Sequence, residues 1–155
     1  MDTDAHAVFG PIENWQAMLQ RHAELFSEMA HGSAIGFVRR TGSGLQPGKH
    51  VAGLAGADGE GRMMAWAVVG NGMSASLRPY TGFGDVQVDL LFVAEDDAIG
   101  AMRDALDADA LSIMRRLIRQ GGIMFYVMKT KYELQDAGYE EFLDTLGLAF
   151  LGACR

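Results

Sequence analysis

Residues 62–77 read RMMAWAVVGNGMSASL, and this stretch decides the fold class. Asn71-Gly72 stands near its centre, and both residues tolerate the positive φ angles that a two-residue hairpin turn requires. Apolar residues from Trp66 to Val69 precede the pair, and the segment from Ser74 to Leu77 follows it. The stretch therefore predicts two antiparallel strands joined by a tight turn.

Four further segments have the composition of strands, and these are residues 34–38, 49–56, 85–94 and 123–128. In the segment 85–94 the apolar residues Val86, Val88, Leu90 and Phe92 fall on one face, as in a half-buried strand. Residues 123–128 are continuously apolar and follow Gly121-Gly122, which is typical of a strand buried on both faces.

Three regions have helical spacing. Pro11 suits a first helical position, and the apolar residues after it recur every three or four positions, which predicts an amphipathic helix over about residues 11–31. A second helical region covers about residues 97–120, where a phase shift at Asp107 to Asp109 leaves one kinked helix and two short ones equally open. The last helix follows Ala137-Gly138.

The order helix, five strands, helix, strand, helix predicts an α+β fold. We expect one antiparallel or mixed sheet of about six strands, with about three helices packed mainly on one face. Residues 1–10 are predicted to form an N-terminal tail. Residues 11–155 form a single domain in this interpretation, because neither a linker nor an internal repeat divides them.

The charge balance argues against two classes of partner. The chain has 20 acidic and 13 basic residues, for a formal charge of −7, so its field repels nucleic acid and anionic membranes. The basic cluster Arg115, Arg116 and Arg119 falls at the end of a predicted helix, where cations complement the helix dipole. We therefore expect neither a nucleic-acid nor a membrane partner.

Compartment signals favour a soluble bacterial protein of the cytoplasm. Cys154 is the only cysteine, so no intrachain disulfide forms. The first residues lack the basic and apolar regions of a secretory signal. The longest uncharged run, residues 63–77, is shorter than the roughly 20 residues of a membrane helix.

No motif specifies a reaction, a cofactor or a metal. The glycine-rich segment from Gly42 to Lys49 lacks the spacing of a phosphate-binding loop. Glu28 and His31 have the Glu-x-x-His spacing of carboxylate-bridged metal sites, but no second such pair occurs. Neither the terminal cysteine nor any serine stands in a nucleophile motif. We expect no cofactor and no metal, and the sequence leaves open whether the protein is an enzyme.

The segment 78–85 is the strongest candidate for a binding site. It joins two predicted strands and combines a cation, aromatic rings, a hydroxyl and glycines. Lys129 and Tyr132 are further candidates because they end a strand that is predicted to be buried. The predicted ligand- or partner-binding residues are therefore Arg78, Tyr80, Thr81, Phe83, Asp85, Lys129 and Tyr132. The alternative is a wide hairpin whose aromatic residues cover the end of the core.

Two functions follow from these observations. The first is a non-catalytic interaction module, with an accessory, regulatory or chaperone-like role, that works as a homodimer. Its main support is strand 123–128, where both faces need cover and helices on one side of the sheet would leave apolar surface for a second subunit. The alternative is a small-molecule-binding protein or enzyme with a pocket beside the 78–85 loop.

Overall fold

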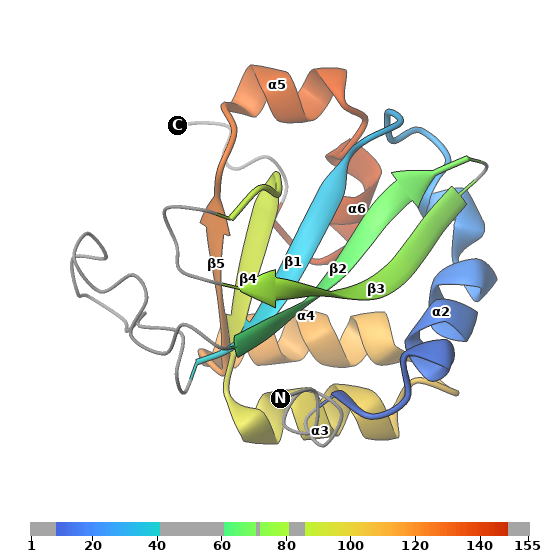
Figure 1. Cartoon of the computed structure of the whole chain (residues 1–155). Coiled ribbons are helices and arrows are strands. Elements are labelled where there is room, and N and C mark those ends of the chain that lie inside the picture. Colours follow the sequence, from blue (N-terminus) through green and yellow to red (C-terminus); the bar gives the residue numbers. More distant parts are fainter. Residues whose placement is uncertain (1–8, 41–60, 71, 81–85, 149–155) are drawn as a thin grey trace.

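The computed structural model describes residues 9–40, 61–70, 72–80 and 86–148. Its strands form one mixed sheet in the order β3-β2-β1-β4-β5 (Figure 1). The strands are β1 (Ala34–Arg39), β2 (Gly61–Val69), β3 (Gly72–Tyr80), β4 (Leu90–Ala94) and β5 (Ile123–Val127). Strands β1 and β4 are parallel, and the other neighbours are antiparallel. The predicted α+β class with a mixed sheet is confirmed, with five described strands; the predicted strand 49–56 lies outside the described residues.

The hairpin that the sequence predicts is the longest pairing in the sheet. Strands β2 and β3 pair from Val69 opposite Gly72 to Gly61 opposite Tyr80. Gly72 already belongs to β3, so the turn begins at Gly70, one residue before the predicted pair Asn71-Gly72, and Gly70 has the positive φ of 58° that such a turn requires. Strand β3 runs to Tyr80, so the segment 78–85 begins inside a strand, and the description of that segment as a loop is corrected for its first three residues.

The prediction of a strand over residues 85–94 is correct only from Leu90. The pairings make β3 and β4 parallel to each other, so the chain must return along the length of the sheet before β4 begins. Residues 86–89 are the end of this return. Val86 and Val88 pack on the face of the sheet that also carries Leu91 and Val93. Leu90 and Phe92 belong to the cluster on the other face, so the prediction that Val86, Val88, Leu90 and Phe92 share one face is wrong.

The helices also differ from the predicted set. They are α2 (Ile12–Arg21), the 3₁₀ helix η1 (Ala23–Phe26), α3 (Asp96–Asp104), α4 (Ala110–Gln120), α5 (Lys131–Asp136) and α6 (Glu140–Thr145). The predicted single helix 11–31 ends at His22, which has φ −108° and ψ 29°. The apolar spacing continues after this break because a 3₁₀ turn has three residues and keeps Phe26 and Met29 on the buried side.

The second helical region consists of two helices rather than one. Asp109 ends the connection between α3 and α4, and its side chain accepts a hydrogen bond from the Ser112 N–H at 3.3 Å. Gly121 ends α4 with a φ of 89°. Helix α5 was not predicted, although Thr130 and Glu133 form a complete capping box at its start.

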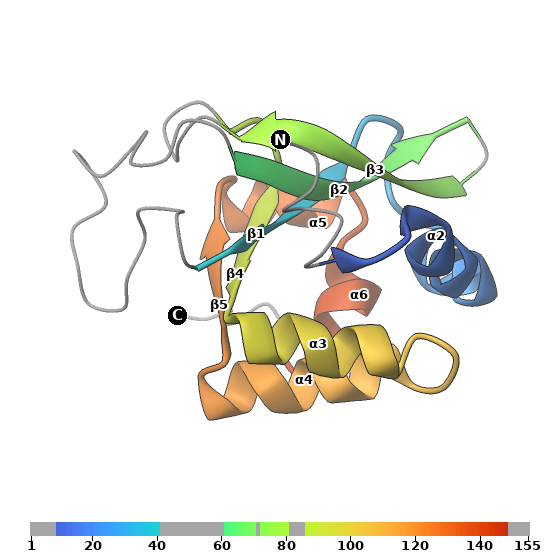
Figure 2. The same ribbon diagram turned by 60° about the horizontal axis from the view of Figure 1, so that its bottom comes forward.

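The main core lies between the sheet and the helices. Helices α2, α3, α4 and α6 lie on this face (Figure 2), which confirms that the helices pack mainly on one side of the sheet. Aromatic rings cluster around Trp66, whose ring centroid lies 4.6 Å from that of Phe37. Two ion pairs, Arg39–Asp96 and Arg40–Glu95, join the end of β1 to the start of α3.

The second face of the sheet carries a smaller apolar cluster. Its buried residues are Ala34, Val38, Met63, Ala67, Tyr80, Val88, Leu91 and Val93. Leu91 and Val93 are fully buried in the single chain. Around this cluster, the described residues Val86, Met124, Tyr126 and Met128 are only partly buried, so some apolar surface remains on this face of the sheet. The homodimer stays a prediction with weaker support.

Candidate functional site

The predicted site residues do not come together in one place. Arg78 and Tyr80 lie at the end of the sheet where β1 and β4 finish. Lys129 follows β5 and lies at the opposite end, where β1 and β4 begin. Thr81, Phe83 and Asp85 lie outside the described residues.

The residues of the predicted site also differ in exposure. Tyr80 is buried in the second-face cluster, and burial together with the nearby Tyr126 raises the pKa of its phenol. Arg78 is half-buried on the same face. Tyr132 is 70% exposed on α5. Tyr80 is therefore placed to cover the core, as the alternative interpretation of this segment expected.

A polar pocket lies where β1 and β4 begin, beside α5, and we call it the α5 pocket. Its volume is about 240 Å³. The loop before β1 forms one wall, and the corner between β5 and α5 forms the other. The lining residues are Ala30, His31, Gly32, Ser33, Asp89, Lys129, Glu133 and Ala137. Of the residues predicted from sequence, this pocket contains Lys129.

The inner wall of the α5 pocket is organised around Asp89. One oxygen of its carboxylate, Oδ2, accepts a hydrogen bond from the Tyr139 hydroxyl at 2.6 Å and from the Ala34 N–H at 3.2 Å. The backbone N–H of Asp89 donates to the Ala34 carbonyl at 2.8 Å. These bonds orient the half-buried carboxylate and tie it to the starts of both β1 and β4.

Tyr139 is the fully buried partner behind Asp89. Burial is the main cause that raises the pKa of its phenol, and the hydrogen bond and charge of Asp89 raise it further. Ser33, the buried polar residue of the pocket wall, contributes a hydrogen bond to the same hydroxyl. Because its pKa is raised, Tyr139 keeps its proton at physiological pH and serves as a permanent donor to the carboxylate.

The outer rim of the pocket carries the other charged groups. Glu133 accepts a hydrogen bond from the Thr130 N–H at 2.8 Å, and the bonds to Thr130, followed by the charge of Lys129, lower the pKa of its carboxyl. His31 accepts the Gly70 N–H through Nε2 at 3.3 Å. The rim therefore presents an ammonium group, a carboxylate and an imidazole to the same space.

The described ranges contain neither a cluster of metal ligands nor a helix that could span a membrane. No three His, Cys, Asp or Glu side chains there are close enough to hold a metal ion, so His31, Asp89 and Glu133 do not form a metal centre. Within those ranges, no helix has both the length and the apolar composition to cross a bilayer.

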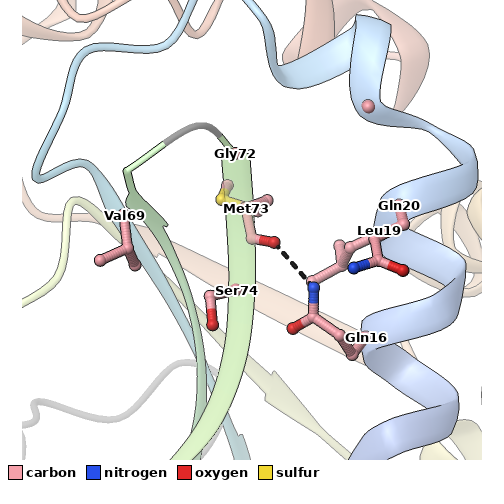
Figure 3. A pocket seen from close by; sticks show the side chains of 8 residues that line it. Gln16, Leu19, Gln20, Val69, Gly72, Met73 and Ser74 are labelled. Atoms are coloured by element: carbon pink, nitrogen blue, oxygen red, sulfur yellow. Dashed lines mark hydrogen bonds between the residues drawn. The ribbon is translucent and has the colours of Figure 1, made fainter.

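A second hollow, of about 360 Å³, lies between α2 and the edge strand β3 (Figure 3). Gln16 crosses it and donates to the Met73 carbonyl at 3.0 Å, while its own carbonyl accepts the Ala75 N–H at 2.7 Å. This is the bonding pattern of a parallel neighbouring strand. Gln16 therefore protects the sheet edge, and Pro79, which has no N–H, protects it further along.

Gln16→Ala is expected to lower the free energy of unfolding by about 1–2 kcal/mol, because two partly buried backbone groups lose their partner. Gln20→Ala is the matched control: Gln20 is exposed in the same hollow, and its loss should cost no more than about 0.5 kcal/mol. Urea unfolding measures both values, and light scattering should detect added self-association in Gln16→Ala alone. Equal costs for the two variants would contradict the edge-protecting role.

Sequence reasoning missed Asp89, Tyr139 and Glu133. The capping-box spacing of Thr130 and Glu133 was a signal that would have placed a helix start next to Lys129. Asp89 and Tyr139 gave no such signal, because 50 residues separate them and only the fold brings them together.

Comparisons with known proteins give little guidance. No family model matches the chain, and no curated protein sequence matches it. Among solved structures, a chain described as "UbiJ-SCP2 Ubiquinone synthesis protein" aligns with a TM-score of 0.46 and 13% sequence identity. The alignment covers 95% of this chain and 98% of that chain. At this level of similarity we take nothing about ligand or activity from the match.

Proposed function

We propose that this protein binds a small polar molecule in the α5 pocket. The observation that carries the proposal is the Asp89 carboxylate, which opens on the pocket and is oriented from behind by the buried Tyr139 hydroxyl at 2.6 Å. Convergent, pre-oriented polar groups in a hollow are the usual mark of a small-molecule site. Lys129 and Glu133 supply further polar contacts at the rim.

The interaction-module interpretation has less support. Large exposed apolar side chains in the described ranges are Val69, Val127 and Tyr132, which lie on β2, β5 and α5. Scattered apolar residues of this kind are normal on a protein surface. The polar α5 pocket favours a small ligand over a protein partner.

The proposal is tested with a thermal-shift screen of amino acids, amines, carboxylic acids, polyols, sugars and nucleotides. A true ligand should raise the melting temperature, because at 100 times its Kd it stabilises the folded state by about 2.7 kcal/mol. Calorimetry with wild type, Lys129→Ala and Gln135→Ala then locates the site. Lys129→Ala should weaken binding about tenfold or more, since it removes a charged contact at the rim.

Gln135→Ala is the control because Gln135 is exposed on α5 and does not line the pocket. It should bind the ligand as wild type does. Lys129 is also exposed, so both variants should keep the melting temperature of the free protein. A screen without any stabilising compound, or a ligand that Lys129→Ala binds normally, would remove the proposal.

A further inference from the structure

The charges of the α5 pocket do not balance. Asp89 and Glu133 contribute two negative charges and Lys129 one positive charge, which leaves one negative charge. The imidazole of His31 is engaged by the Gly70 N–H, which donates to its Nε2 at 3.3 Å. The pocket is therefore complementary to one additional positive charge.

Lys129 and Glu133 both line the rim of the pocket. The pKa of the Glu133 carboxyl is lowered mainly by its hydrogen bonds to Thr130, and the charge of Lys129 adds a smaller effect in the same direction. The capping box holds Glu133 in place, since its Oε1 accepts the Thr130 N–H while its own N–H donates to the Thr130 hydroxyl. Lys129 and Glu133 thus offset each other at the rim.

The negative charge that remains in the pocket is that of the Asp89 carboxylate. Its two hydrogen-bond donors, Tyr139 and the Ala34 N–H, are neutral, and both bond to Oδ2. The ion pairs found in the described part of the chain, Arg39–Asp96 and Arg40–Glu95, lie at the opposite end of the sheet. Within that same part of the chain, Oδ1 of Asp89 accepts no hydrogen bond and meets no cation.

Resting on the proposed function, we infer that the ligand is a small primary amine whose ammonium group pairs with Asp89. An ammonium donates to a carboxylate through a charge-assisted hydrogen bond, and partial burial strengthens the pair. Lys129 can meet an acceptor elsewhere on the same molecule. Tyr139 is a positioning residue in this scheme, because it orients Asp89 without lining the pocket.

The test titrates the wild-type protein with ethanolamine, glycine, N-acetylglycine, acetate and glycerol, and follows amide chemical shifts by NMR. We expect ethanolamine and glycine to shift the amides around Asp89 and Lys129, and N-acetylglycine, which lacks the ammonium, to bind at least tenfold more weakly. Glycine binding more tightly than ethanolamine would identify an amino-acid ligand, and the reverse order a simple amine. Both orders support the inference.

Asp89→Asn keeps an oxygen acceptor for Tyr139 and Ala34 but removes the charge. Its affinity for the amines should be at least tenfold lower than that of wild type, and the affinity of Gln135→Ala should be unchanged. The comparison of amines with N-acetylglycine uses wild type alone and decides the question even if Asp89→Asn fails to fold.

The outcomes separate this inference from the proposed function. Binding of acetate or glycerol at the pocket without binding of either amine would overturn the amine assignment and leave the small-molecule proposal in place. A broader screen in which no compound of any class binds at the pocket would overturn both. Amine binding that Asp89→Asn retains in full would overturn the role of Asp89.

Discussion

Gly138→Ala is expected to lower the free energy of unfolding by more than about 4 kcal/mol, a large part of the stability of an ordinary domain. Gly138 has a φ of 84°, a conformation that an alanine adopts only with strain. A Cβ at this position would also overlap the backbone carbonyl group of Glu28, which cannot move as a flexible side chain can. Urea unfolding followed by circular dichroism measures the loss.

Gly121→Ala separates the two causes. Gly121 has a similar φ of 89°, and no atom lies within 4 Å of the place where its Cβ would stand. It should therefore show the backbone strain alone, about 1–2 kcal/mol. If both variants lost the same stability, the close approach to Glu28 would have no energetic consequence.

The close approach at Gly138 also shapes the α5 pocket. The Ala30 N–H donates to the Ala137 carbonyl at 2.8 Å, and both alanines line the pocket. The segment before β1 and the corner after α5 are thus held together by backbone contact. A side chain at Gly138 would push these two walls apart, so a glycine outside the pocket helps to determine its width.

Short sequence patterns predicted the elements that depend on residues close together in the chain. The turn residues around Gly72 and the apolar run of β2 gave the hairpin, and Gly121 ended α4 where expected. The prediction of a strand over residues 85–94 failed before Leu90 for a physical reason. Alternation reports which residues turn away from solvent, and Val88 is buried and Val86 half-buried by packing on the sheet rather than by pairing in it.

The candidate site was harder to predict than the fold because long-range contacts form it. Lys129 lines the α5 pocket, but the strand before it, β5, is a half-buried edge strand and not the strand buried on both faces that the sequence predicted. Arg78 and Tyr80 are predicted to share a site with Lys129, but β3 runs parallel to β4 and β5 runs antiparallel to it, so β3 and β5 finish at opposite ends of the sheet. Asp89 gains its role from Tyr139, a contact that no short sequence pattern contains.

A second large loss of stability is expected from the substitution of Trp66, which is fully buried at the centre of the aromatic cluster. Its ring lies 4.6 Å from Phe37 and 6.4 Å from Trp15, Phe26 and Phe142, measured between centroids. Trp66→Ala would leave a cavity among these rings and is expected to cost about 3–5 kcal/mol of unfolding free energy. Urea unfolding should show this loss as a lower midpoint with a similar slope.

Trp66→Phe should cost clearly less than Trp66→Ala, although phenylalanine is also smaller than tryptophan. The Trp66 Nε1–H is buried and has no hydrogen-bond partner among the described residues. Such a donor lowers stability by about 1–3 kcal/mol, and phenylalanine removes it while it keeps most of the ring packing. The stability gained by removing the unpaired N–H offsets part of the stability lost with the smaller ring. If Trp66→Phe proved as costly as Trp66→Ala, the indole N–H would have to donate to a group that stabilises the core.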